Sequence, residues 1–134
     1  MDNKKRTLIV DDYPGVREGL RSLLSSHQDF DIVGEAGDGL EAIELVSKLH
    51  PDLVLMDMSM PRMDGMTAIR EIKKKWPKTL VLAFTVHKSP EYVFATLIAG
   101  ADGYILKDDP WTDLITSIEN ILKGEQVISP YFLN

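Results

Sequence analysis

The amino-acid sequence predicts an α/β fold, a doubly wound five-stranded parallel sheet with five helices packed against it. Short apolar runs rich in β-branched residues alternate five times with longer segments whose apolar residues recur at helical spacing. The short runs are nearly continuous in their apolar character, which is typical of parallel strands covered by helices on both faces. The chain has 134 residues, a suitable length for one compact domain.

The predicted strands are short and bounded by polar or turn-forming residues. In chain order they are TLIVDD (7–12), FDIVGEA (30–36), PDLVLMD (51–57), TLVLAFT (79–85) and GYILK (103–107). The sequence contains no repeat and no low-complexity segment, so residues 1–126 are expected to form one domain. Residues 127–134 are expected to be a C-terminal tail, in which Ser129-Pro130 begins a turn or a linker.

Each predicted helix follows a strand and places its apolar residues on one face. In chain order the helices span residues 14–27, 38–50, 64–76, 89–101 and 110–124. Asp38, Asp64 and Ser89 suit N-cap positions, because a side-chain oxygen there accepts a hydrogen bond from a free backbone N–H. Gly100 suits a C-cap position, because glycine readily adopts the left-handed conformation that often ends a helix.

The composition argues against several classes of site. The absence of cysteine rules out a disulfide framework, a thiolate metal site and a cysteine nucleophile, and it fits a reducing cytoplasm. A net charge of −6 argues against a broad basic face for nucleic acid on this segment. No apolar run approaches the roughly 20 residues of a membrane helix, and the N-terminal apolar run is too short for a signal peptide.

Polar side chains follow four of the predicted strands at the points where the strands end. Asp11 and Asp12 end the first strand and Asp57 ends the third. Thr85 ends the fourth strand and Lys107 ends the fifth. In open parallel sheets, ligands bind beyond the carboxyl ends of the strands. A lone acid there is most often a cap or turn residue, but the coincidence across four strands favours a site.

The residue types at these strand ends predict phosphoryl chemistry. Three clustered carboxylates repel one another and need a counter-charge. Mg²⁺ prefers a few carboxylates together with water and phosphate oxygens. A lysine and a threonine hydroxyl suit the other oxygens of a phosphoryl group. Since an aspartate can act as a covalent nucleophile and form an aspartyl phosphate, the site is expected to accept a phosphoryl group with Mg²⁺ as cofactor.

The sequence motifs, taken in order, resemble the receiver domain of bacterial two-component response regulators. They are LIVDDYPGVREGL, VGEAGDGLEA, PDLVLMDMSMPRMDG, VLAFTVH and AGADGYILKD, and they span nearly the whole chain. The motif DGYILKD followed by GEQVISP resembles the NarL/FixJ (LuxR-type) branch of the family. In that branch the receiver usually precedes a helix-turn-helix DNA-binding domain. The resemblance implies a flavodoxin-like receiver fold with strand order 2-1-3-4-5.

The resemblance also implies the role of each acidic residue. Asp57 would be the phosphoacceptor and would also bind Mg²⁺. Asp12 would ligate the ion directly and Asp11 mainly through water. The backbone carbonyl of Ser59 would be the third protein ligand, and the Asp64-Gly65 pair would shape the loop that presents it.

The remaining implied roles concern the phosphoryl group and the switch. Thr85 and Lys107 would contact the phosphoryl group, and Tyr104 would turn inward as Thr85 moves. Many receivers place proline after this lysine, whereas Asp108 follows it here, so no cis peptide bond is assumed.

Three residues around the site are expected to tune access to Asp57. Val86 follows Thr85 at a position where a smaller residue is common in the family. Its bulk, together with Ser59 and His87, is expected to tune the rates of phosphorylation and dephosphorylation.

Apolar residues on the fourth and fifth helices are candidates for an interface. The fourth helix carries Tyr92, Phe94 and Leu97 with little polar surface, so it is either mostly buried or a face for a partner, and we favour the partner. Trp111, at the first turn of the last helix, suits the edge of the core and an interface equally. The expected partners are a sensor histidine kinase, a second copy after phosphorylation, and DNA only through a C-terminal domain outside this chain. No membrane partner is expected.

Three functions other than a phosphorylated switch that controls transcription can be compared with the residues present. An aspartate-based phosphatase needs a second acid two residues after the nucleophile, and Ser59 stands there instead. A receiver that works without phosphate would be expected to lack one of Asp12, Asp57, Thr85 or Lys107, and all four are present. A stand-alone receiver acting through protein contacts remains an alternative.

Overall fold

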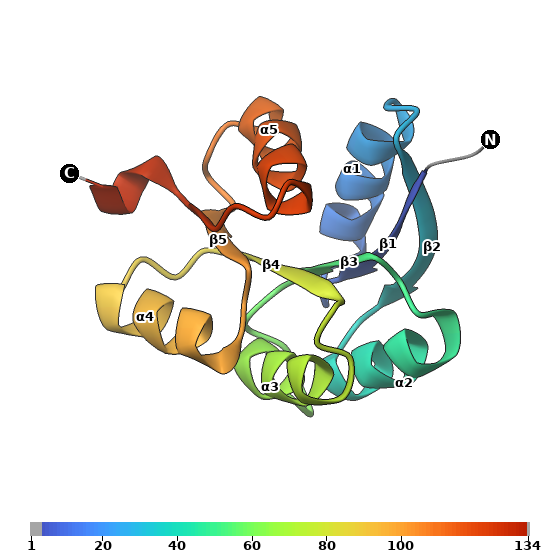
Figure 1. The fold of residues 1–134 in the computed structure, drawn as a ribbon, viewed down its shortest axis with the longest axis horizontal. Helices are drawn as coiled ribbons and strands as arrows, with labels where there is room; N and C mark the ends of the chain where they lie inside the picture. Colours follow the sequence, from blue (N-terminus) through green and yellow to red (C-terminus); the bar gives the residue numbers. More distant parts are fainter. Residues whose placement is uncertain (1–3, 134) are drawn as a thin grey trace.

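The computed structural model describes residues 4–133, which form a parallel sheet with helices on both faces (Figure 1). The strands are β1 (Lys5–Val10), β2 (Phe30–Ala36), β3 (Leu53–Met56), β4 (Leu80–Thr85), β5 (Gly103–Leu106) and β6 (Val127–Ile128). The helices are α1 (Pro14–Ser25), α2 (Gly39–Leu49), α3 (Gly65–Lys75), α4 (Pro90–Ala99) and α5 (Trp111–Leu122), followed by the short 3₁₀ helix η1 (Pro130–Leu133).

The predicted doubly wound topology is confirmed. The strands lie in the order β2-β1-β3-β4-β5-β6 and all neighbouring pairs are parallel. Helices α1 and α5 cover one face, and α2, α3 and α4 cover the other (Figure 1). The structure differs from the predicted five strands by the short β6, which extends the sheet beyond β5. A two-residue strand shows too little periodicity to be recognised in a sequence.

The core has two apolar layers, one on each face of the sheet. Leu8 and Val10 of β1 pack in the layer beneath α2, α3 and α4, whereas Ile9 between them packs in the layer beneath α1 and α5. Successive side chains of a strand point to opposite faces, so a strand covered on both sides must be apolar at every position. This explains why LIV and LVLM occur as continuous runs in β1 and β3.

Two of the three predicted N-caps are confirmed. The Asp38 side chain accepts a hydrogen bond from Glu41 N at 2.9 Å, and Asp64 accepts one from Thr67 N at 2.8 Å. Ser89 occupies the N-cap position of α4 but makes no capping bond, and its hydroxyl contacts Glu91 instead. Gly100 ends α4 with φ of 120°, a conformation that favours glycine.

The strand register brings the site residues together. Val10 lies opposite Met56, and Asp57 N donates to Val10 O at 2.9 Å, so Asp11 and Asp57 leave adjacent strands side by side. On the other side, Lys107 N donates to Thr85 O at 2.8 Å. The carboxyl ends of β1, β3, β4 and β5 therefore meet at one edge, as the sequence predicted.

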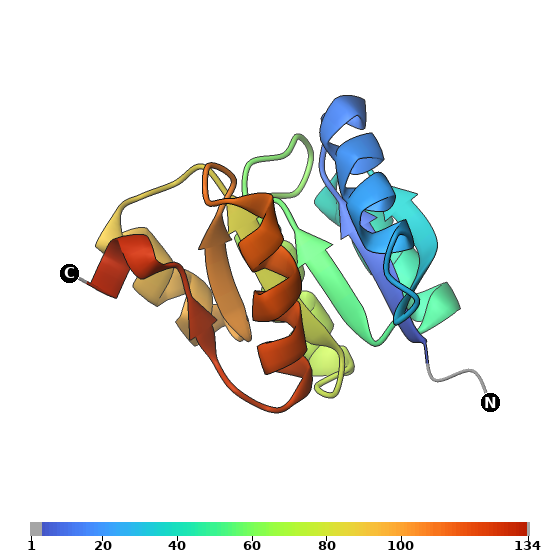
Figure 2. The same cartoon turned by 90° about the horizontal axis from the view of Figure 1, so that it is seen from above.

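The C-terminal segment Val127–Leu133 packs on the domain beside β5 (Figures 1 and 2). Ser129 is fully buried and its N–H donates to Tyr104 O at 2.8 Å. The Phe132 ring meets the Tyr104 ring edge-on, with centroids 5.8 Å apart. The predicted boundary at residue 126 and the linker role of 127–134 stay predictions, but residues 127–133 are here in contact with the sheet.

Within residues 4–133, no helix combines the length and the apolar character needed to cross a membrane.

Candidate functional site

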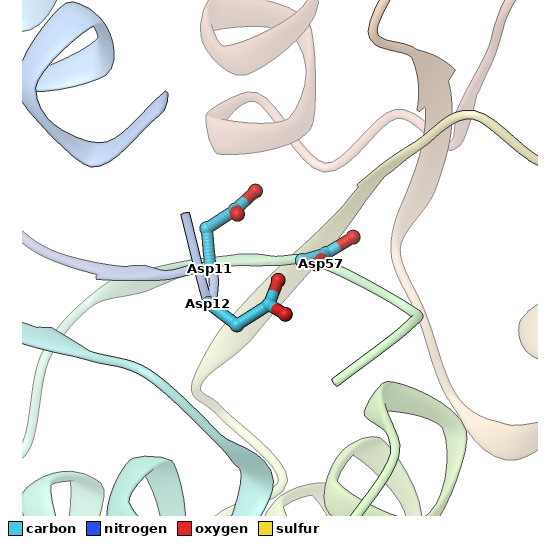
Figure 3. A group of neighbouring side chains, drawn as sticks. All are labelled: Asp11, Asp12 and Asp57. Atoms are coloured by element: carbon cyan, nitrogen blue, oxygen red, sulfur yellow. The ribbon is translucent and has the colours of Figure 1, made fainter. Parts of the chain in front are cut away.

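Three carboxylates form a cluster at the carboxyl edge of the sheet. Asp11 and Asp12 follow β1 and Asp57 follows β3, and one oxygen from each lies within 4.8 Å of the others (Figure 3). Asp11 and Asp57 are buried and Asp12 is partly exposed. The sequence predicted this grouping correctly, because two strands in register deliver consecutive polar residues to the same edge.

Lys107 is the cation beside the cluster. Its Nζ lies 2.6 Å from Asp11 Oδ2 and 3.3 Å from Asp57 Oδ1. Burial disfavours the charged amine, but the hydrogen bond to Asp11 and the charges of Asp57 and Asp11 outweigh it and raise the pKa of Lys107. One ammonium therefore serves two buried carboxylates.

That single cation does not fully compensate Asp57. Burial, followed by the negative charge of Asp11, raises the pKa of Asp57 to about 6, while Lys107 acts in the opposite direction. Desolvation and a like charge both penalise the ionised carboxylate. The site consequently favours any further positive charge that approaches Asp57.

Asp12 is the second residue whose surroundings favour a bound cation. Its Oδ1 is buried and has no hydrogen-bond partner among the described residues. Buried carboxylate oxygens are rarely left without a donor, because desolvation costs free energy that nothing returns. The residues present fit a hard divalent ion such as Mg²⁺, which binds carboxylate oxygens.

Thr85 and Tyr104 are linked through the main chain of His87. Thr85 is buried, and its Oγ1 accepts a hydrogen bond from His87 N at 3.3 Å. The Tyr104 hydroxyl donates to His87 O at 2.8 Å, and the ring is completely buried. Burial raises the pKa of Tyr104, so the phenol stays neutral and keeps its donor. The residue predicted as the switch lies in the inward position.

Of the three residues predicted to tune access, two touch each other. The Ser59 hydroxyl and His87 Nε2 share a hydrogen bond that spans the loops after β3 and β4. The His87 ring also stacks on Tyr92, with centroids 4.6 Å apart. Val86 is 63% exposed. The predicted role of the Ser59 carbonyl as a metal ligand stays a prediction.

The predicted interface residues divide into exposed and packed ones. Phe94 is 66% exposed, and Ile98, one turn further along α4, is 70% exposed. Tyr92 and Leu97 are half-buried and pack against the core. Trp111, whose role the sequence left open, packs edge-on against Phe84 at 5.8 Å between ring centroids.

Two arginines near the site were missed. Arg17 Nη1 donates to Asp11 O at 2.5 Å, and its Nε contacts Glu35 at 3.2 Å. Arg62 pairs with Asp38 across the loop after β3. The four-residue spacing of Arg17 and Arg21 indicated that they share one helix face, but only the structure shows that both contact Glu35 of β2. No local pattern pointed to Arg62.

Comparison with known proteins places the chain in a family. The model of the response regulator receiver domain matches residues 7–119. The nitrate/nitrite response regulator protein NarL of Escherichia coli is 38% identical over 122 residues, which cover 91% of this chain and 56% of that protein. The chain thus spans little more than half the length of the curated relatives it matches.

Solved structures agree with this placement. A LuxR-family two-component response regulator from Aurantimonas is 36% identical with a TM-score of 0.91, and the match covers 95% of this chain and 91% of that one. The isolated receiver domain of RcsB from Salmonella enterica, solved with phosphomimetic BeF₃⁻, is 30% identical with a TM-score of 0.89 and 96% coverage of both chains. The chain therefore belongs to the response regulator receiver domain family, and its relatives are response regulators of the NarL/LuxR type.

Proposed function

We propose that this domain is a phosphorylation switch in which Asp57 accepts a phosphoryl group from the phosphohistidine of a sensor kinase. The observation that carries the proposal is the position of Asp57, buried between a carboxylate cluster and a single lysine that lies 3.3 Å away. Family membership and the likeness to a receiver solved with a phosphomimetic support it.

Mg²⁺ is the cofactor that we propose for this site. Asp11, Asp12 and Asp57, with the backbone carbonyl of Ser59, would hold it. The ion would supply positive charge for the phosphoryl oxygens and for the carboxylates together. The orphaned Asp12 oxygen and the raised pKa of Asp57 are the two features of the described residues that favour this role.

In the proposed reaction, an Asp57 carboxylate oxygen attacks phosphorus and forms the new O–P bond. The P–N bond of the phosphohistidine breaks, and its electron pair stays on the imidazole nitrogen, which can then take up a proton from solvent. Lys107 neutralises charge on the transferred group, and the Thr85 hydroxyl donates to one of its oxygens. With a pKa of about 6, Asp57 is mostly ionised at neutral pH and able to attack.

The conformational change would be transmitted from Asp57 to the surface through the main chain of His87. Thr85 Oγ1 and the Tyr104 hydroxyl bind opposite ends of the His87 residue, at its N–H and its carbonyl. A Thr85 hydroxyl drawn toward a phosphoryl group would release the His87 N–H and change the position of the loop before α4. Phe94 and Leu97 of α4, with Trp111 and Tyr92, are the proposed partner-facing residues.

The output of the switch is proposed to be transcription, through dimerisation and a DNA-binding domain outside this chain. A solved structure shows two RcsB dimers bound to two parallel DNAs, and the match to it covers 96% of this chain and 66% of that one. A stand-alone receiver that acts through protein contacts is the alternative. We propose no turnover of an external phosphoester, because Ser59 offers no carboxylate to act as the general acid.

Intact-mass measurement after incubation with acetyl phosphate and MgCl₂ tests the proposal. We expect one phosphoryl group on the wild type, none on Asp57→Asn, and a much slower gain when EDTA replaces MgCl₂. A gain on Asp57→Asn as well would move the acceptor elsewhere. No gain on a wild type that circular dichroism shows to be folded would overturn the phosphoacceptor role.

A further inference from the structure

The loop between β3 and α3, residues 58–64, contains Ser59, whose backbone carbonyl is one of the proposed Mg²⁺ ligands. Its base is closed by Gly65 N, which donates to Met58 O at 3.3 Å. A Cβ at Gly65 would lie 2.4 Å from Asp57 O, so only glycine fits there. The upper part of the loop is more open to solvent, and Ser59, Pro61 and Arg62 are exposed.

The exposed part of this loop is fastened to the start of α2. Met63 O accepts a hydrogen bond from Gly39 N at 3.1 Å. The approach is close, since a Cβ at Gly39 would lie 2.5 Å from Met63 O. Beside it, Arg62 Nε donates to Asp38 Oδ2 at 2.8 Å, and Arg62 Nη2 contacts the same oxygen. Two consecutive loop residues, Arg62 and Met63, thus bind the N-cap and the first residue of α2.

Arg62 adopts an unusual backbone conformation for this contact. Its φ is +66°, in the left-handed region where glycine is comfortable and side chains carry a conformational cost. Glycine would adopt the same turn without that cost, but it would lose the guanidinium. The ion pair is therefore the feature of Arg62 that offsets its unfavourable backbone.

Asp38 is well suited to receive the guanidinium. Its Oδ1 caps α2 through Glu41 N and its Oδ2 is left for Arg62. The hydrogen bond from Glu41 N, followed by the contact with Arg62, lowers the pKa of Asp38. The Asp38 side chain is only 12% exposed, so this pair is better shielded on one side than an ordinary surface ion pair.

We propose that Asp38 and Arg62 are positioning residues of the phosphoacceptor site. Their ion pair holds the β3–α3 loop against α2, so that the Ser59 carbonyl stays at the height of Asp57. The pair thereby sets the affinity of the site for Mg²⁺ and, through it, the rate of phosphorylation. The inference rests on the proposed function, because it assigns the pair a role in the same site.

The first test compares Arg62→Gly and Arg62→Lys with the wild type. Arg62→Gly removes the ion pair and raises the entropy of the unfolded chain, but it also removes the left-handed backbone cost, so these effects on stability largely offset one another. If the pair had no role at the phosphoacceptor site, the Mg²⁺ affinity would be unchanged. We expect a small change in thermal stability but about tenfold weaker Mg²⁺ binding by calorimetric titration, in the range seen when groups that orient ligands are lost. Arg62→Lys, which keeps a charge, is expected to restore part of the affinity.

Arg21→Ala is the matched control. Arg21 also forms a surface ion pair, with Glu35 at 2.7 Å, but on α1 and away from the loop. Its Mg²⁺ affinity is expected to stay within about twofold of the wild type. Asp38→Asn keeps an oxygen for Glu41 N and loses the charge, so its effect and that of Arg62→Gly should not add in the double variant.

A second readout does not depend on the metal. In metal-free protein, the Gly39 amide, which donates to the loop, is expected to exchange with deuterium faster in Arg62→Gly than in the wild type. Unchanged exchange together with unchanged Mg²⁺ affinity would overturn the positioning role. If the wild type itself neither bound Mg²⁺ nor gained a phosphoryl group, the proposed function would fail, and faster exchange would still support the contact between Arg62 and α2.

Discussion

The carboxylate cluster around Asp57 and the C-terminal segment Val127–Leu133 both lie beside the loop after β4, but they are held by different interactions. In the cluster, Lys107 lies between the buried carboxylates Asp11 and Asp57. Burial and repulsion by Asp11 still raise the pKa of Asp57. The segment is held by main-chain hydrogen bonds and by Phe132 against Tyr104, while Tyr131 lies under the Lys88 ammonium at 5.1 Å. Charged contacts therefore dominate the carboxylate cluster, whereas hydrogen bonds and aromatic contacts hold the C-terminal segment.

This difference predicts that substitutions near Asp57 change the stability in either direction, depending on which charge is removed, whereas substitutions in the C-terminal segment lower it. In the cluster, the negative charge of Asp57 is disfavoured by burial and by Asp11, so removing that charge increases stability. The described contacts of the C-terminal segment are favourable, so removing a ring there decreases stability. A region whose charges are not balanced is suited to respond to a ligand, because the ligand relieves a cost that the protein already carries.

The largest effect is expected for Lys107→Met, which keeps the aliphatic chain and removes the charge. Asp11 and Asp57 would be left buried without their common cation, so the free energy of unfolding at pH 7 in EDTA should fall by about 3 kcal/mol. Urea unfolding measures this loss. Adding MgCl₂ should recover part of it, whereas an equal loss with and without MgCl₂ would mean that packing, not charge, was lost.

Asp57→Asn is expected to act in the opposite direction. Because the folded pKa of about 6 exceeds the ordinary value of 3.8, the unfolded chain releases its proton first. The contribution of Asp57 to the stability of the wild type should therefore fall as the pH rises from about 4 to about 6 and stay lower above that. The variant lacks this loss.

Relative to the wild type in EDTA, Asp57→Asn should be more stable at pH 7 by about 1–3 kcal/mol, and the gain should shrink toward pH 4. Thermal unfolding over this pH range measures it. A gain of the same size at both pH values would show that the charge of Asp57 is not its source.

A smaller loss is expected for Phe132→Ala in the C-terminal segment. Phe132 is partly buried against Tyr104, so its removal should lower the free energy of unfolding by about 1–2 kcal/mol, less than for a fully buried ring. Leu133→Ala is the matched control, since Leu133 is 70% exposed in the same 3₁₀ turn, and its effect should stay within about 0.5 kcal/mol. Equal losses in urea unfolding would indicate that the ring contact contributes nothing of its own.

Much of the site was predictable because its residues follow strands. Asp11, Asp57, Thr85 and Lys107 each come directly after a run whose apolar character requires burial, and parallel strands in register bring their ends to one edge. The caps Asp38 and Asp64 were predictable for a similar reason, because a capping bond spans only three residues. Ser89 makes no capping bond because its hydroxyl donates to the Glu91 carboxylate instead, so a suitable residue type does not ensure a capping bond.

The sequence by itself therefore determined the order of strands and helices, the two-layered core and the acids and lysine of the carboxyl edge. These features depend on local periodicity and on which residues can be buried. Only the tertiary structure decided that Arg62 binds Asp38, 24 residues away, and that Phe132 covers Tyr104. Such contacts join segments that are distant in the chain, and their partners are set by how the helices and loops close over the sheet.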